Sequence, residues 1–318
     1  MKYSDTQFLR ALGILIIINS HLDNYYPIPQ IATGGAIGNS IFFFLSAFGL
    51  YLSQQKNKIS FSQWFTNRIS RIYPSLWLVL IFILMPLEII NGTLSIAETT
   101  SFIGNFFNPP YWFLQALLVY YLITYVLLKN NNHKNIVCAL IILSVIYFIC
   151  YFSWVDLTKW SVEKSPFDLI HYLMIFIFGI FIATQNEKIT YTGYSNYLML
   201  AFIIMAVYAH KFLMSKGHYL EFQFIQQIAM YPIVVYLLKI SRSPFIVSGL
   251  MKSKIMAPAA RFLSNHTLEI YIIHETINNP VQKLQLPFPV NVFIFLILTF
   301  GLAAIVNKLA EKTRNIIN

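Results

Sequence analysis

Apolar segments long enough to cross a lipid bilayer recur along the whole chain, and no other feature restricts its fold as strongly. A transmembrane helix needs about 20 mostly apolar residues. Of the 318 residues, 57% are hydrophobic and only 11% are charged, and the mean hydropathy is +0.62. This composition is too apolar for the polar surface of a soluble protein. We therefore predict an all-α, polytopic integral membrane bundle of about ten transmembrane helices, near residues 7–24, 36–54, 73–90, 111–129, 135–153, 168–185, 195–214, 220–240, 260–278 and 290–309.

The distribution of basic residues predicts how this bundle is oriented. Loops on the cytoplasmic side of membrane proteins carry an excess of Lys and Arg. With a cytoplasmic N-terminus and ten spans, seventeen Lys and Arg residues fall inside and five outside. We therefore expect both termini to be cytoplasmic. Basic inner loops also account for the net charge of +10, so nucleic-acid binding is not expected.

The chain is predicted to form a single membrane-embedded domain over residues 1–318. Its loops are too short for an added soluble catalytic domain, and no internal repeat of the kind found in many transporters is evident. Because Cys138 and Cys150 fall in one apolar segment, they suggest neither a disulfide framework nor a zinc cluster. We expect no metal. The first apolar segment lacks a small-residue cleavage pattern, so we expect it to remain as a helix.

Arg10 and His21 stand at the two ends of the first predicted span. In an α-helix, eleven residues make about three turns, so both side chains project from one face and lie about 16 Å apart along the axis. Ionisable residues in transmembrane segments mark functional sites by default. The alternative is structural, with Arg10 reaching the lipid headgroups and His21 forming a solvated helix end.

Two further arginines, Arg68 and Arg71, lie in the sequence NRISRIYP, which we assign to the inner loop before the third span. If this segment is helical, the two side chains share one face. Paired guanidinium groups suit bidentate phosphate binding. Lipid headgroup contact and topology signalling are the alternatives.

Three ionisable residues, His266, Glu269 and His274, are expected to lie in the one helix of the ninth predicted span. His274 is expected near the outer leaflet, at a depth similar to that of His21. Two histidines from different helices at one depth can form an acid/base site. Glu269, which lies deeper, needs a partner or must be protonated.

The start of the fourth span, YWFLQ, carries aromatic and amide side chains. Tyr111 and Trp112 have the placement of ordinary interfacial aromatics. Gln115, one turn further in, is able to form a hydrogen bond inside the bundle.

Taken in order, these motifs resemble those of the acyltransferase 3 family of integral membrane acyltransferases. The family pattern is an arginine and a histidine bracketing the first helix, a Phe-rich segment ending in Leu-Ser-Gly-Phe, an Arg-x-x-Arg-x-Tyr-Pro segment and a late Tyr-Leu-x-His. The corresponding segments here run from Arg10 to His21, Phe42 to Phe48, Arg68 to Pro74 and Tyr271 to His274. Two departures are Ala47 in place of the glycine and the absence of the glutamate that follows the tryptophan of the fourth span in many members.

The resemblance implies transfer of an acyl group, usually acetyl from acetyl-CoA, to a hydroxyl of an envelope or secreted carbohydrate. It implies no permanently bound cofactor, a carbohydrate or lipid-linked glycan as acceptor, and a multi-pass location in a bacterial inner membrane among its lipids. Arg10, Arg68 and Arg71 would bind the phosphates of the donor. His21 would act as general base, with a covalent acyl-histidine as the less favoured version, and His274 would orient the reactants or assist as an acid.

Two other classes of function remain open on the sequence alone. A transporter or flippase for a glycan or small metabolite would use the same ionisable residues along a pathway or proton relay. Such a protein moves its substrate intact, whereas an acyltransferase releases free CoA thiol. A non-catalytic membrane scaffold would tolerate replacement of the ionisable residues.

Overall fold

Every regular element in the computed structural model is helical within the residues that it describes, 3–56, 60–92, 102–129, 133–162 and 167–317. The predicted all-α class is confirmed. Eleven of the described helices lie over the apolar segments, and two short ones, α4 (Met85–Ile90) and α10 (Phe224–Ile228), lie beside them. The others are α1 (Tyr3–Ser20), α2 (Gly35–Lys56), α3 (Phe61–Val79), α6 (Trp112–Lys129), α7 (His133–Trp154), α8 (Phe167–Thr184), α9 (Ser195–Ser215), α11 (Met230–Ser241), α12 (Met256–Asn265), α13 (Thr267–Gln282) and α14 (Val290–Ile317).

Eight helical segments of the described chain are long and apolar enough to cross a membrane, which indicates a multi-pass membrane protein. The predicted count of ten is not confirmed. Helix α1 falls short in hydropathy because its first half carries Asp5, Gln7 and Arg10. The expected span 260–278 is divided into α12 and α13, because the backbone leaves helical geometry at His266.

The segment NRISRIYP belongs to helix α3 and is not a loop, which corrects the predicted boundary of the third span. Ser60 caps the start of α3 by accepting a hydrogen bond from the backbone N of Gln63 at 3.3 Å. Helix continues through a π-helical turn, Leu80–Leu84, into α4, so that Phe61–Ile90 forms one long element. Arg68 and Arg71 therefore do share one helical face, as the spacing predicts for a helix.

The chain divides into two compact units. The first comprises Met1–Gly13, Ala36–Lys58 and Tyr120–Arg261, and the second comprises Ile14–Gly35, Ile59–Val119 and Phe262–Asn318. Helices α1, α6 and α12 contribute residues to both units, and α2 contributes its first residue, Gly35, to the second. The family motifs are consequently shared between the units.

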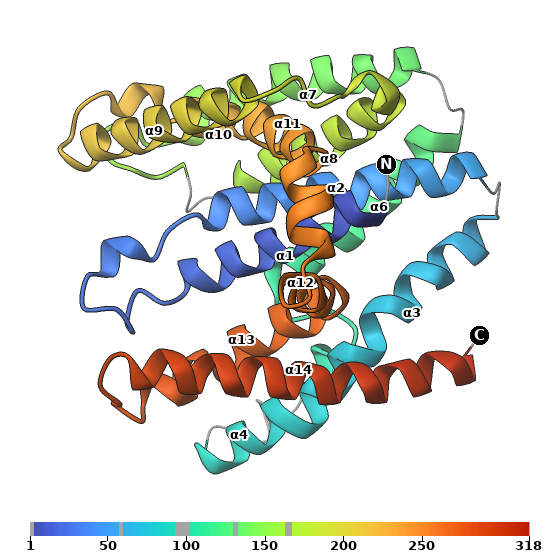
Figure 1. Ribbon diagram of the computed structural model, residues 1–318, viewed down its shortest axis with the longest axis vertical. Coiled ribbons are helices and arrows are strands. Elements are labelled where there is room, and N and C mark those ends of the chain that lie inside the picture. The colour runs from blue at the N-terminus through green and yellow to red at the C-terminus, as the bar shows by residue number, and fades with distance from the viewer. Residues whose placement is uncertain (1–2, 57–59, 93–101, 130–132, 163–166, 318) are drawn as a thin grey trace. The chain divides into compact units, whose positions relative to one another are not determined.

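In the first unit, α7 packs against α8, and α9 packs against α11 (Figure 1). An aromatic core of Tyr147, Tyr151 and Phe167 joins α7 to α8, with the Tyr147 and Phe167 ring centroids 4.6 Å apart. Helix α8 approaches α2 very closely at Gly179. A Cβ at this position would lie 2.5 Å from the backbone oxygen of Phe44 and 3.2 Å from the Cβ of Ala47. The Phe-rich motif of α2 is therefore a packing surface for α8.

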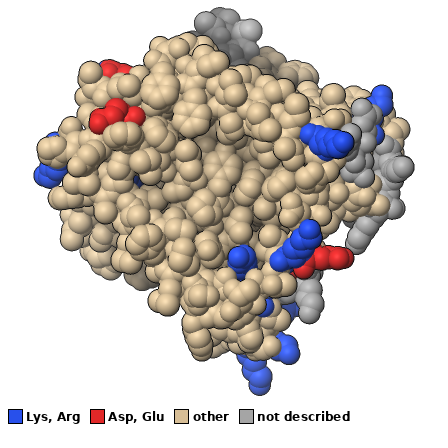
Figure 2. All heavy atoms as spheres, turned by 90° about the horizontal axis from the view of Figure 1, so that it is seen from above, with Lys and Arg blue, Asp and Glu red and all other residues tan. Residues whose placement is uncertain are grey.

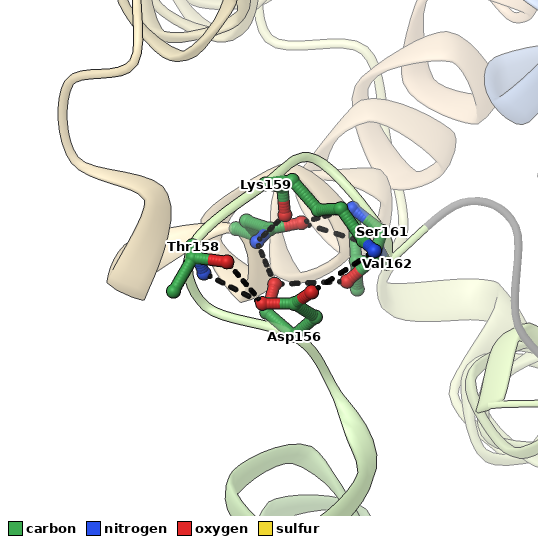
Figure 3. A network of polar contacts seen from close by, with 6 residues as sticks. Asp156, Thr158, Lys159, Ser161 and Val162 are labelled. Carbon is green, nitrogen blue, oxygen red and sulfur yellow. Dashed lines mark hydrogen bonds and ion pairs between the residues drawn. The ribbon is translucent and has the colours of Figure 1, made fainter.

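A polar network holds the connection between α7 and α8 (Figure 3). The fully buried Gln223 side chain accepts hydrogen bonds from the backbone N of Ser161 and of Val162, at 2.9 and 3.1 Å. It donates to the backbone oxygens of Asp156 and Lys159. Hydrogen bonds from Thr158 and the nearby Lys159 ammonium lower the pKa of Asp156 to about 2, so this carboxylate stays ionised at physiological pH.

Charged side chains are few and scattered on the face drawn in Figure 2. Large apolar side chains are exposed on α7 and α9, including Ile141, Phe152, Leu198 and Phe202. Exposed apolar side chains on membrane-length helices are the expected contact surface for lipid tails.

In the second unit, α13 and α14 lie side by side, and α3 packs against both (Figure 1). The helices are linked by a buried polar cluster. Glu269 of α13 accepts a hydrogen bond from the Ser75 hydroxyl of α3 at 2.6 Å and forms an ion pair with Arg314 of α14 at 3.2 Å. Arg314 also donates to the Ser75 oxygen at 3.1 Å.

Candidate active site

The connection that follows α1 folds back onto the helix from which it emerges. The Asn19 side chain donates to the backbone oxygens of Ile31 and Thr33, at 2.9 and 3.1 Å. Gly34 turns the chain with φ of +100°, a conformation that glycine adopts without strain. A Cβ there would lie 2.6 Å from the Ile16 side chain, so the position also needs glycine for space. His21 is thus the first residue of the connection between α1 and α2, which is held at one end by Asn19 and at the other by the turn at Gly34.

Tyr25 attaches this connection to α13 and α14. Its hydroxyl donates to the backbone oxygen of Asn278 at 3.0 Å, and its own backbone oxygen accepts from the Asn291 side chain at 2.9 Å. The Tyr25 ring packs on Phe295 with centroids 5.1 Å apart. These contacts hold the end of α1 beside the middle of α13.

The result is a cluster of two histidines and one carboxylate. The rings of His21 and His274 meet edge to face with centroids 4.9 Å apart. One oxygen of Glu275, Oε1, lies 3.4 Å from Nε2 of His21 and 3.9 Å from Nε2 of His274. His274 is fully buried, whereas the side chains of His21 and Glu275 are 35% and 29% exposed. The cluster is therefore closed on the His274 side and accessible on the other.

The tautomer of His274 follows from its hydrogen bond. Nδ1 lies 3.1 Å from the backbone oxygen of Ile270, which can only accept, so Nδ1 carries the proton. In the neutral ring Nε2 then holds a free lone pair, and among the described residues it has no hydrogen-bond partner. Neutral His274 therefore presents a hydrogen-bond acceptor, Nε2, on the side that faces His21 and Glu275.

The start of α6 forms one wall of this cluster. Tyr111 is buried, and its hydroxyl shares a hydrogen bond of 2.7 Å with Thr276 of α13. Trp112, by contrast, is 40% exposed, as an interfacial aromatic would be. Gln115 is also exposed and donates to the backbone oxygen of Pro109 at 2.8 Å. This hydrogen bond joins residues that are close in sequence and does not link Gln115 to another helix of the bundle.

Glu269 lies outside the histidine cluster. Its polar contacts among the described residues are with Ser75 and Arg314, which supply the partner that a buried carboxylate requires. His266, the residue between α12 and α13, is also separate, because its Nδ1 donates to the backbone oxygen of Phe262 at 2.7 Å and its ring stacks on the Phe262 ring with centroids 4.3 Å apart. Of the three ionisable residues predicted for the ninth span, only His274 lies with His21.

The three arginines predicted to bind the donor are divided between the two units. Arg68 and Arg71 belong to α3 in the second unit, where Arg71 is exposed and the guanidinium of Arg68 lies 5.9 Å from the centre of the Trp64 ring. Arg10 is half-buried on α1 within the first unit. A joint role for all three stays a prediction.

A groove of about 510 Å³ lies between α4 and the second half of α13. It is lined by amide, hydroxyl and charged side chains together with Leu84, Leu87 and Pro280, and its residue Thr276 directly follows Glu275 in the sequence. The Lys283 ammonium donates to the Asn91 side chain across it at 3.2 Å. The polar lining residues are Glu88, Asn91, Thr276, Asn279, Gln282 and Lys283.

The sequence was compared with models of known protein families. The model of the acyltransferase 3 family, described as an acyltransferase domain, matches residues 4–308. The chain belongs to this family. The match covers both units, so the resemblance found in the four motifs holds for nearly the whole acyltransferase. Neither the comparison with curated proteins nor that with solved structures finds a match.

Sequence reasoning missed three residues of the acyltransferase's histidine cluster and its walls. Glu275 directly follows His274 in a largely apolar helix, and the cost of an ionisable residue there was the signal that could have identified it. Tyr111 has the placement of an interfacial aromatic, and Thr276 is an ordinary helical residue. Only the folded chain shows that they meet.

Proposed function

We propose that this membrane acyltransferase transfers an acetyl group from cytoplasmic acetyl-CoA to a hydroxyl of an envelope or secreted polysaccharide. The observation that carries the proposal is the cluster of His21, His274 and Glu275, which joins two motifs separated by 253 positions in the sequence. An imidazole beside a carboxylate, accessible from one side, is a suitable general base for a hydroxyl. The acceptor is a carbohydrate or a lipid-linked glycan in this proposal, and the location is the inner membrane.

The second unit supports a donor that enters from the cytoplasmic side. Ser75 lies level with Glu269, and Asn91 lies level with Lys283, so α3 with α4 runs in the same direction as α13. From Arg71 to Ser75 is four residues, and from Glu269 to His274 is five. Nine residues of helical rise place Arg71 about 14 Å along the axis from His274. This separation is comparable to the length of an extended pantetheine arm.

In this proposal Arg68 and Arg71 pair with the phosphates of CoA while the thioester reaches His21. In this arrangement the acyl group crosses the membrane although CoA does not. Arg10, at the inner end of α1 under the predicted topology, is the third candidate for phosphate binding. No permanently bound cofactor is needed.

The acceptor binds in the groove between α4 and α13 in this proposal. Amides, a carboxylate and an ammonium group, as at Asn279, Glu88 and Lys283, match the many donors and acceptors of a sugar. Thr276 brings the groove to the edge of the histidine cluster. A hydroxyl of the bound glycan would then approach His21.

The chemistry follows from the position of Glu275. Its carboxylate favours the His21 tautomer with a proton on Nε2, which leaves the Nδ1 lone pair to accept the acceptor's hydroxyl proton. The alkoxide oxygen attacks the thioester carbonyl, a C–O bond forms, and the C–S bond breaks. The departing CoA thiolate then takes the proton back from Nδ1. His274 orients the reacting groups through its free Nε2.

The test is acyl transfer by purified protein in detergent, with release of CoA thiol and of labelled acetyl product measured together. His21→Ala should lower both rates by roughly 10²- to 10⁴-fold, since general-base catalysis contributes that much. His218→Ala, at an exposed position outside the cluster, is the matched control and should retain the rate of the unsubstituted protein.

A folded His21→Ala protein with full acyl transfer would overturn the role of His21. Movement of an intact glycan across the membrane without CoA release would favour the transporter instead. Arg68→Ala and Arg71→Ala test the donor site separately. Both should weaken acetyl-CoA binding, and unchanged affinity in both variants would contradict the phosphate contacts.

A further inference from the structure

The histidine cluster also has the composition of a metal site. One ring nitrogen of His21, one ring nitrogen of His274 and one carboxylate oxygen of Glu275 all lie within 4.8 Å of one another. Two imidazoles and one carboxylate form a known ligand set for zinc, which commonly leaves a fourth position open. The open position here would lie on the accessible side of His21 and Glu275.

His274 is already prepared as a ligand. Metal-binding histidines usually donate the proton of the other ring nitrogen to a carbonyl or carboxylate, which fixes the ring and the tautomer. The hydrogen bond from Nδ1 of His274 to Ile270 does this. Its Nε2 is fully buried and has no hydrogen-bond partner among the described residues, which is costly unless something binds there.

To bind one zinc ion, the three ligand atoms must move closer together than their present separations of up to 4.8 Å. Around a tetrahedral zinc with bonds near 2.0 Å, ligand atoms lie about 3.3 Å apart. The separation of His21 and Glu275 is 3.4 Å, and that of His274 and Glu275 is 3.9 Å. His21 lies in the turn just after α1, and the side chains of His21 and Glu275 are 35% and 29% exposed, so rotation of these two side chains would bring the ligand atoms together.

The nature of the ligands also selects the metal. Imidazole nitrogens favour zinc and other late transition metals, whereas magnesium and calcium take oxygen ligands. With two of the three ligand atoms being nitrogen, a zinc-type cation is the fitting occupant.

We propose that His21, His274 and Glu275 bind a Zn²⁺-type cation that reversibly inhibits acyl transfer. The inhibition, though not the binding, rests on the proposed function. A metal on Nε2 of a neutral imidazole requires the proton to be on Nδ1. His21 would then have no lone pair to accept the hydroxyl proton, and Glu275 would be occupied by the metal. The cation is thus a regulator and not a resident cofactor.

Binding is tested by calorimetric titration of the purified, chelator-treated protein with ZnCl₂. One cation per chain is expected. Glu275→Gln, which keeps the shape of the side chain, and His274→Gln should each raise Kd at least tenfold. His218→Gln should leave Kd unchanged. Size-exclusion chromatography checks that each variant is folded, and equal Kd for Glu275→Gln and the unsubstituted protein would overturn the site.

Inhibition is tested on the unsubstituted protein by CoA release. ZnCl₂ should lower the rate, EDTA should restore it, and EDTA alone should not reduce it. Loss of activity in EDTA that zinc restores would overturn the inhibitory role. Acyl transfer by a protein that does not bind zinc would reject only the metal site. Zinc binding by a protein that releases no CoA would reject only the proposed function.

Discussion

Glu269 illustrates how a buried carboxylate in a transmembrane region is stabilised by a partner distant in sequence. Its side chain is 3% exposed, and it faces the Arg314 guanidinium at 3.2 Å and the Ser75 hydroxyl at 2.6 Å. Removing one member of a buried ion pair leaves the other charge without compensation, which costs far more than the net contribution of the pair. The contact therefore links α3, α13 and α14 at a single point.

Arg314→Leu should destabilise the protein by roughly 3 kcal/mol, because the Glu269 carboxylate would stay buried without its cation. The measurement is the midpoint of thermal unfolding in detergent. Glu269→Leu should cause a similar loss.

The double variant Glu269→Leu/Arg314→Leu is the control for this pair. It should be more stable than either single variant, since replacing both charges removes the uncompensated one. Losses that simply add in the double variant would show that the two side chains do not interact.

At the scale of elements, the contact between α2 and α8 depends on the absence of a side chain at Gly179. The nearest atom to an added Cβ is a backbone oxygen, that of Phe44, which cannot rotate away. The two helices would have to separate. Ala47, which stands where the family usually has glycine, is fully buried in the same contact, so this departure from the family pattern concerns packing.

Gly179→Ala should therefore lower stability by about 1–3 kcal/mol through overpacking, although alanine favours helix. Thermal unfolding in detergent measures the change. Gly49→Ala in α2 is the matched control, because no atom lies within 4 Å of its added Cβ, and it should be neutral or slightly stabilising. A Gly179→Ala protein as stable as the Gly49→Ala protein would contradict the close approach.

The sequence predicted most helices because apolar length is a strong local signal. Helices α7 and α9 begin and end within two residues of their expected bounds. The division between α12 and α13 was not predicted, because both halves are helical and only the backbone at His266 interrupts them. The partners of Glu269 and the position of Glu275 depend on contacts between distant helices, which no local pattern encodes. The meeting of His21 and His274 was expected only from their similar depth.

At the scale of the whole molecule, the excess of basic residues in alternate connections predicts the sides of the membrane. Under that topology the turn containing Asp23 and the end of α13 at Lys283 face outward, and Lys254 faces the cytoplasm. The proposed donor site requires Arg68 and Arg71 to face the cytoplasm, and the proposed acceptor site requires the groove to face outward. A reversed topology would place the groove in the same compartment as CoA.

Single cysteines in a Cys138→Ser/Cys150→Ser background test the topology in intact cells. A membrane-impermeant maleimide should label Asp23→Cys directly. It should label Lys254→Cys only after permeabilisation. The reverse pattern would contradict the predicted orientation and with it the direction of acyl transfer.

The position of Arg314 affects where the C-terminal boundary of the acyltransferase domain should be drawn. The family match stops at residue 308, six residues before Arg314. A boundary drawn there would cut away the cation that compensates Glu269, although the matched segment would look whole. The functional limit of this domain therefore lies at least one and a half helical turns beyond its recognisable sequence, and shortened versions of the chain should keep the end of α14.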